Sequence, residues 1–378
     1  MLPADHWMRL RRQLLVALLV LTMTLAGLLV LALVGSSTGL VGFLIGICLA
    51  AIPVPVVLAA LRWLDRYEPE PRGVLLFCFF WGATVAALAA TIINSASALA
   101  LARAGAGGQA GLADTALLVA PWVEEAAKGL AVLLVLVFRR REVDGVVDGI
   151  VLAGLSGLGF AFTENILYFG RAFLSGEDLG LTGGIFAVGI TFVLRGVLSP
   201  FAHPLFTSML GLGVGLAVTT RRPAVRVLAP VAGYLAGALL HFVWNASSLA
   251  GTGAFFSGYV TVMVPVFAVT AAVAHWARRR EGLIVARHLP AYVQAGWLTP
   301  HDVTMVASLP RRRQAQEWAE GALGPRGRAA LQAFQHAATE LAFLRARADR
   351  VLAPDDFVRR ERDLLDQLSQ ARDRANRG

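Results

Sequence analysis

Apolar stretches of about 20 residues or more recur along this chain of 378 residues, and they constrain its fold more than any other feature. Soluble cores use apolar runs of about four to eight residues, whereas about 20 residues carry a helix across a bilayer. Only 16% of the residues are charged, against roughly a quarter in a soluble domain. Eight apolar segments cover residues 14–34, 40–61, 74–102, 113–138, 147–169, 185–218, 227–250 and 255–276. We therefore predict an all-α polytopic membrane protein, a bundle of about eight transmembrane helices, and exclude an ordinary soluble enzyme.

The arginines indicate the orientation of these helices. Of the 34 basic residues all but one are arginine, and the formal net charge is +9. Alternate loops hold 15 arginines in one set and 2 in the other, and positive loops stay on the cytoplasmic side. This predicts a multi-pass protein of the cell (inner, cytoplasmic) membrane with both termini in the cytoplasm. Because the basic charge follows the membrane topology, we expect membrane lipid as a neighbour and no nucleic-acid partner.

The sixth segment, residues 185–218, is too long for one straight crossing. Its interior contains Arg195, Pro200, His203 and Pro204. Proline removes a backbone donor and kinks a helix, and polar groups at such a break face protein or a cavity. We expect a broken helix here.

The composition changes after residue 280. Residues 281–378 are rich in charged residues, and apolar positions such as Leu331, Phe334 and Leu341 recur at helical spacing. We therefore divide the chain into a transmembrane domain, 1–280, and a small C-terminal cytoplasmic helical region, 281–378. The mixed charges indicate a solvated surface, with contact to anionic lipid or to a partner as the alternative.

Ionisable residues inside the membrane are costly, and they are therefore candidates for function. The only lysine, Lys128, follows Glu124 by four residues and Glu125 by three, spacings at which helical side chains touch. A self-neutralising ion pair is the simpler interpretation. One lysine cannot neutralise two glutamates, however, so one carboxylate stays available for proton transfer or metal binding.

A second group of candidates follows a ladder of small residues. Residues 149, 153, 157 and 161 are glycine or alanine at a spacing of four, a face that lets membrane helices approach closely. Asn165 continues this face and Glu164 adjoins it. Both should point into the bundle, either for packing or for chemistry.

Two histidines, His203 and His241, lie deep in apolar segments. A lone buried histidine usually serves as a hydrogen-bonding group, but two histidines with a carboxylate are the ligands of a catalytic zinc, which activates water. Asn245 lies four residues after His241 and could orient it or donate to an oxyanion.

Three motifs together resemble the PrsW family of intramembrane metalloproteases, which is distantly related to the CAAX membrane proteases. They are Glu-Glu-x-x-Lys at 124–128, Phe-x-x-x-Glu at 160–164 and His-x-x-x-Asn at 241–245, within residues 50–250. The resemblance implies cleavage of a single-pass, membrane-anchored substrate such as an anti-sigma factor. It also implies that Glu124 or Glu125, together with His241, is essential.

The leading hypothesis is therefore an intramembrane endopeptidase. Glu124 or Glu125 acts as the general base and Lys128 tunes this pair. Glu164, His203 and His241 hold a metal, most simply zinc, or polarise the peptide carbonyl, and Asn245 supports the oxyanion. Metal-free chemistry by glutamate and histidine stays open, as do a proton-coupled transporter and a membrane scaffold.

Overall fold

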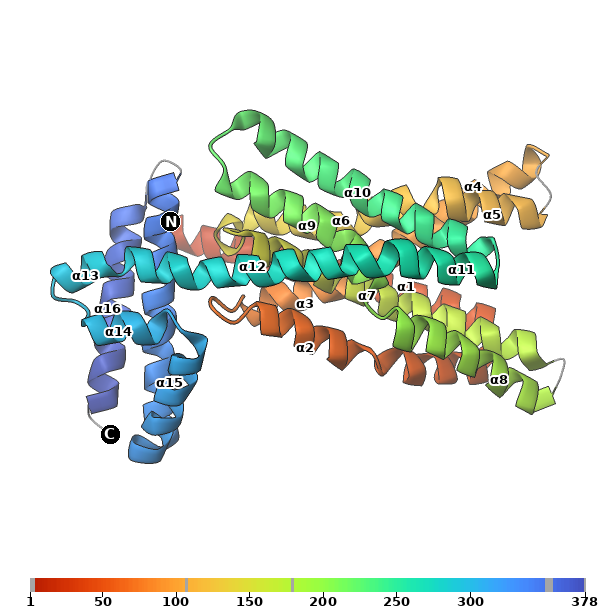
Figure 1. The fold of residues 1–378 in the computed structure, drawn as a ribbon. Coiled ribbons are helices and arrows are strands. Elements are labelled where there is room, and N and C mark those ends of the chain that lie inside the picture. The colour runs from red at the N-terminus through yellow and green to blue at the C-terminus, as the bar shows by residue number, and fades with distance from the viewer. Residues whose placement is uncertain (1–3, 106–107, 178–179, 351–355, 377–378) are drawn as a thin grey trace.

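The computed structural model describes residues 4–105, 108–177, 180–350 and 356–376, and all regular elements in these ranges are helical. Figure 1 shows a bundle of long helices, with α13 to α16 gathered at the end where α1 begins. The helices are α1 (Ala4–Ala51), α2 (Val54–Leu64), α3 (Arg72–Trp81), α4 (Ala87–Arg103), α5 (Gly108–Leu118), α6 (Ala120–Phe138), α7 (Val146–Glu177), α8 (Gly180–Phe192), α9 (Ala202–Thr219), α10 (Pro223–Leu249), α11 (Thr252–Gly258), α12 (Val264–His288), α13 (Pro290–Gln294), α14 (Pro300–Val306), α15 (Leu309–Arg350) and α16 (Phe357–Asn376). Short segments complete them: the 3-10 turn η2 (Arg140–Glu142) and the π-helical η1 (Gly82–Ala86), η3 (Val193–Leu198) and η4 (Tyr259–Met263).

Within the described ranges, six helical stretches are long and apolar enough to cross a membrane. They are Gln13–Leu64, Arg72–Arg103, Val146–Gly176, Gly180–Thr219, Pro223–Leu249 and Thr252–Gln294. The expected crossings 14–34 and 40–61 both fall in the first stretch, and the expected crossing 113–138 falls on α5 and α6. The chain is thus an all-α, multi-pass membrane protein, as predicted, while the count of eight crossings stays a prediction.

The first stretch, 52 residues long, changes direction at Gly39. This glycine has a φ of 63°, in the left-handed region that glycine adopts without strain. Beyond it the chain runs antiparallel to α7: a Cβ at Gly42 would lie 3.0 Å from the carbonyl oxygen of Gly170, and a Cβ at Gly46 would lie 2.5 Å from that of Ile166. The stretch therefore forms a helical hairpin against α7.

Helix α7 occupies the centre of the bundle, and 89% of its most apolar window is buried. The predicted ladder of small residues brings its backbone close to α9. A Cβ added at Gly149 would lie 2.0 Å from the carbonyl oxygen of Gly211, and one at Gly157 would lie 2.5 Å from that of His203. Such close backbone packing holds membrane helices together without a large apolar driving force.

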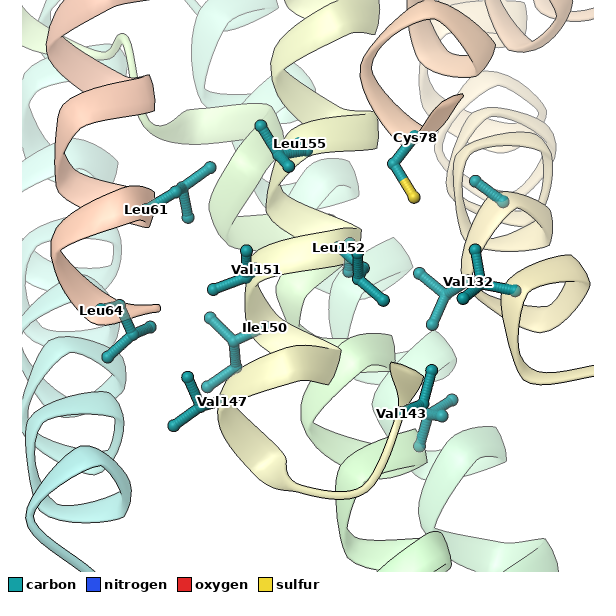
Figure 2. Close-up of a cluster of buried hydrophobic side chains, with 14 of the residues drawn as sticks. Leu61, Leu64, Cys78, Val132, Val143, Val147, Ile150, Val151, Leu152 and Leu155 are labelled. Atoms are coloured by element: carbon teal, nitrogen blue, oxygen red, sulfur yellow. The ribbon is translucent and has the colours of Figure 1, made fainter. Parts of the chain in front are cut away.

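Aliphatic side chains fill the space around the first turns of α7. Figure 2 shows this cluster of buried residues from α2, α3, α6, α7 and the loop that precedes α7. The labelled residues are Leu61, Leu64, Cys78, Val132, Val143, Val147, Ile150, Val151, Leu152 and Leu155. The cluster fixes α6 against α7, and these two helices carry most of the buried carboxylates described below.

The substitution Gly149→Ala is expected to lower the thermal stability of the protein. Its Cβ would overlap the Gly211 carbonyl oxygen, so α7 and α9 would have to separate, at a cost of about 1–3 kcal/mol. The matched control is Gly189→Ala in α8, where nothing lies within 4 Å of the added Cβ. Unfolding midpoints in detergent would measure both variants. Equal midpoints for the two would contradict the close packing of α7 on α9.

The break predicted in the sixth segment is present. Helix α8 continues as the π-helical η3, and α9 begins at Ala202. Ser199 between them leaves helical geometry, with φ −129° and ψ 37°, and its hydroxyl donates to the Leu194 carbonyl oxygen at 2.7 Å. The break places His203 in the first turn of α9 and Arg195 on η3, so that both can face α7.

The C-terminal helices pack on the arginine-rich end of the bundle. Their own apolar core includes Val285, Leu289, Phe334 and Leu341. Helix α12 runs through residue 280 without interruption, so the predicted division at 280/281 lies within a helix and stays a prediction. Arg312 Nη1 donates to the Tyr67 carbonyl oxygen at 2.9 Å and so ties α15 to the loop after α2.

The loop between α2 and α3 is acidic, and it contacts α15 of the C-terminal helices. Burial raises the pKa of Asp65 to about 7. Burial also raises the pKa of Glu70 to about 11, and the charge of Asp148 adds to this effect. The main-chain N–H of Glu70 donates to Asp65 Oδ2 at 3.0 Å. Glu70 is therefore neutral at pH 7, and the loop is less negative than its sequence implies.

Candidate active site

The Glu-Glu-x-x-Lys motif lies on α6, with all three ionisable side chains buried. Lys128 is fully enclosed, and its Nζ donates to Glu125 Oε1 at 2.6 Å. The same Nζ lies 3.6 Å from Glu124 Oε2. The predicted i, i+3 and i, i+4 contacts are both present, and the i, i+3 pair is the closer one.

Glu125 is saturated with hydrogen-bond donors. Besides Lys128, the Thr207 hydroxyl donates to its Oε2 at 2.8 Å, and His241 Nδ1 lies 2.9 Å from its Oε1. Because a carboxylate only accepts, His241 Nδ1 carries the proton and Nε2 keeps a free lone pair. Glu125 therefore fixes both the orientation and the tautomer of His241, and the Phe206 ring stacks on the imidazole with centroids 5.1 Å apart.

Glu124 has one engaged and one unengaged oxygen. Its Oε1 accepts from Asn94 Nδ2 at 3.2 Å. Its Oε2 is buried, and no described residue hydrogen-bonds to it. The nearest histidine atom, His241 Nε2, is 3.7 Å away. Two lone pairs thus face each other across a short gap with no donor between them, and a cation or a water could bridge them.

His203 joins this group from the start of α9. Its Nδ1 lies 3.1 Å from Lys128 Nζ and its Nε2 lies 2.7 Å from Glu164 Oε2. An ammonium group only donates, so Nδ1 accepts and the Nε2–H donates to the carboxylate. The two imidazole rings meet edge to face, with the centroids of His203 and His241 5.1 Å apart.

Glu164 is held by the broken segment as well as by His203. Arg195 of η3 forms an ion pair with Glu164 Oε2, and its Nε donates to Asn165 Oδ1 at 2.8 Å. The Arg195 guanidinium also lies over the Tyr168 ring, 3.8 Å from its centroid. Both hydrogen bonds to Glu164 use Oε2. The Glu164 side chain keeps 19% of its surface exposed, against 7% for Glu124 and 2% for Glu125.

Three of these residues meet the geometric requirement for a metal site. Glu124, His203 and His241 each offer one ligand atom, and these atoms lie within 4.8 Å of one another. All three residues are buried. The unengaged Glu124 Oε2 and the free lone pair of His241 Nε2 fit a bound cation, and two imidazoles with a carboxylate are a donor set that transition metals accept. The residues present therefore fit a metal, which on His203 would take the Nδ1 lone pair that accepts from Lys128 here.

The family model described as PrsW family intramembrane metalloprotease matches residues 70–270 of this chain. The chain belongs to the PrsW family of intramembrane metalloproteases. No curated protein and no solved structure in the comparisons matches it. Membership identifies the protein as a metal-dependent protease of the membrane, and the buried glutamate and histidine cluster lies within the matched residues.

The structure brings most of the predicted site residues of this PrsW protease together. Glu124, Glu125, Lys128, His203 and His241 form one connected cluster through the distances given above. Glu164 contacts this cluster through His203 and lies outside the compact group of three. The assignment of individual roles stays a prediction.

Asn245 is the one predicted site residue that points elsewhere. Its Nδ2 donates to the Ala116 carbonyl oxygen at 2.8 Å, which attaches α10 to α5. It lies one turn after His241 on α10, but its amide is occupied by this contact. The geometry therefore favours a packing role over the expected support of an oxyanion.

Sequence reasoning did not assign three residues of the PrsW site. Thr207 follows His203 by four residues, a spacing that could have indicated a shared face. Arg195 was a candidate functional residue only because an arginine inside a membrane segment is costly, and no motif gave it a role. Asn94 on α4 gave no signal, because one asparagine in an apolar helix is common and its contact with Glu124 depends on how α4 packs on α6.

Proposed function

We propose that this PrsW protease cleaves a single-pass membrane protein, of the anti-sigma-factor kind, within or next to the membrane, and that it uses zinc. The observation that carries the proposal is the convergence of Glu124, His203 and His241 in the buried centre of the bundle. A water-activating site at this depth would act on a peptide bond that enters from the bilayer.

In this proposal Glu124, His203 and His241 hold the metal. Imidazole and carboxylate donors suit zinc, and the buried position keeps competing water away. Bound zinc would supply a water of lowered pKa and would polarise the scissile carbonyl. This assignment places Glu124 in the ligand set where the sequence led us to expect Glu164.

The remaining residues orient these groups and move protons. Glu125 holds His241 through Nδ1, which orients the ring and leaves the opposite nitrogen for the metal. Lys128 balances the charge of Glu125, and it would release His203 Nδ1 to the metal. Glu164 accepts the proton of the attacking water at Oε1, because the interactions with Arg195 and His203 both use Oε2 and its side chain is the most exposed of the three glutamates.

We also propose that the protein lies in the cell membrane with the arginine-rich end, where α13 to α16 pack, in the cytoplasm. The support is the loop count of 15 arginines against 2. Both termini would then be cytoplasmic.

The test is cleavage by the purified protein in liposomes that also contain a tagged single-pass substrate. We expect cleavage that disappears when a chelator has removed the metal and returns with added zinc. Metal analysis should give about one zinc per chain, as the one compact group of three ligands among the described residues implies. Undiminished cleavage by metal-free protein would refute the zinc assignment, and the absence of cleavage of any membrane-anchored substrate would refute the proposed substrate class.

A further inference from the structure

A cavity of about 660 Å³ lies far from the site above, where the bundle meets the C-terminal helices. Its walls come from the last turns of α6 and α9, from η2 and the loop after it, from the first turn of α10, and from parts of α15 and α16. The most conspicuous lining residues are five arginines: Arg140, Arg141, Arg226, Arg347 and Arg360.

The acidic residues of the cavity neutralise only part of this charge. Asp144 accepts from Arg347 at 2.8 Å, and Asp356 pairs with Arg141. Among the described residues these two are the only carboxylates in the lining, against five arginines. Glu142 and Glu340, outside the lining, interact electrostatically with Arg360. The described lining residues therefore carry a formal net charge of +3, the difference between these two counts.

The other three arginines are available to a ligand. Arg140, Arg226 and Arg360 form no ion pair within 4.0 Å among the residues that the structure describes. Arg226 is held in place by its Nε, which donates to the Thr220 carbonyl oxygen at 3.1 Å and leaves both terminal nitrogens free. Arg360 lies in the first turn of α16, where the helix dipole also favours an anion.

The other lining residues are apolar and lead to the lipid-facing surface. Leu136 and Val137 of α6, Val218 of α9 and Phe343 of α15 form this part of the wall. Val137 is 71% exposed, and its neighbour Phe138 at the end of α6 is 75% exposed. One side of the cavity is thus cationic, and the other side continues into the apolar exterior of the spanning helices. Both sides lie at the ends of these helices.

We propose that this cavity binds the headgroup of an anionic phospholipid from the adjacent leaflet. The three free guanidinium groups would bind its phosphate oxygens, and the acyl chains would lie against Val137 and Phe138. Arginine suits phosphate because its planar donors bind two oxygens at once, and basic pockets at the ends of transmembrane helices are typical sites for such lipids. A soluble phosphate would leave the apolar wall without a partner, so the lipid fits the cavity better.

A bound lipid would also connect two parts of the chain. Arg140 and Arg226 belong to the membrane bundle, whereas Arg360 belongs to α16. One headgroup held by all three would fasten α16 to the bundle. Anionic lipid should therefore stabilise the whole protein, independently of the protease site.

The test uses the purified full chain in detergent, with phosphatidylglycerol, cardiolipin, phosphatidylcholine or inorganic phosphate added separately. We expect the two anionic lipids to raise the unfolding temperature and to remain attached in native mass spectrometry, and the other two to do neither. The triple variant Arg140→Gln, Arg226→Gln, Arg360→Gln should bind phosphatidylglycerol about 10- to 100-fold more weakly.

The matched control removes the same charge from the same end of the protein. Arg62, Arg72 and Arg279 are exposed and lie outside the cavity, so their replacement by glutamine should leave binding unchanged. If the cavity triple variant does not fold, the single variant Arg140→Gln should still bind about 3- to 5-fold more weakly. Equal binding of phosphatidylcholine, equal protection by inorganic phosphate, or unchanged lipid binding by the cavity variants would each overturn the proposal.

Discussion

Glu124→Gln is expected to remove the bound metal and to abolish substrate cleavage at the same time. Glutamine preserves the size of the side chain and the acceptor for Asn94 Nδ2, but it replaces the anionic Oε2, which accepts no hydrogen bond from the described residues and lies 3.6 Å from Lys128 Nζ. Loss of an anionic ligand from a three-residue site should lower metal affinity about 10-fold or more and cleavage about 1,000-fold or more. Zinc content and the cleavage rate in liposomes would measure the two effects.

The control for Glu124→Gln is Glu317→Gln, an exposed glutamate on α15 that changes the same charge far from the site. It should retain both the metal and the activity. A Glu124→Gln protein that keeps a full complement of zinc would show that Glu124 is not a ligand. The metal would then have to be held by the histidines and another carboxylate, with Glu164 as the nearest choice.

The sequence was sufficient to predict the fold class and the break before His203. Both follow from local rules: about 20 apolar residues cross a membrane, and prolines within a long segment interrupt a helix. The prediction that the ladder of small residues on α7 allows close helix packing was also correct. A spacing of four residues defines one helix face whatever helix packs against it. The same reasoning gave the neighbours of Lys128, which lie on its own helix.

The division of roles among the glutamates was beyond sequence reasoning. Glu124 and Glu125 are adjacent in sequence, yet the hydrogen bonds that distinguish them come from different helices, from α4 to Glu124 and from α9 and α10 to Glu125. Thr207 and His241 contact Glu125 at hydrogen-bond distance, whereas the one hydrogen bond to Glu124 from a described residue comes from Asn94. The packing of these helices decides which carboxylate oxygen receives no hydrogen bond. A short sequence motif carries no information about that packing.

Asn245 also shows that helix spacing alone does not identify the partner of a side chain. Its spacing of four from His241 is correct for a shared face, but the face is wide enough for the amide to contact α5 instead. Arg195 became important only because the break turns η3 toward α7. Its partners, Glu164 and Asn165, were predicted to point into the bundle, and the break supplies the cation that they meet there.

Glu164→Gln is expected to separate metal binding from catalysis. Glu164 lies outside the three-residue metal group and contacts it only through His203 Nε2, so the variant should keep the metal. It cannot accept a proton at Oε1, and the loss of a general base lowers rates about 100- to 10,000-fold. The cleavage rate and the zinc content of the same preparation would be compared with those of Arg195→Lys, which preserves a cation beside an intact carboxylate and should lose far less activity. If Glu164→Gln cleaves at the parental rate, the proton goes to another group, and if it loses zinc along with activity, Glu164 is a ligand as the sequence first indicated.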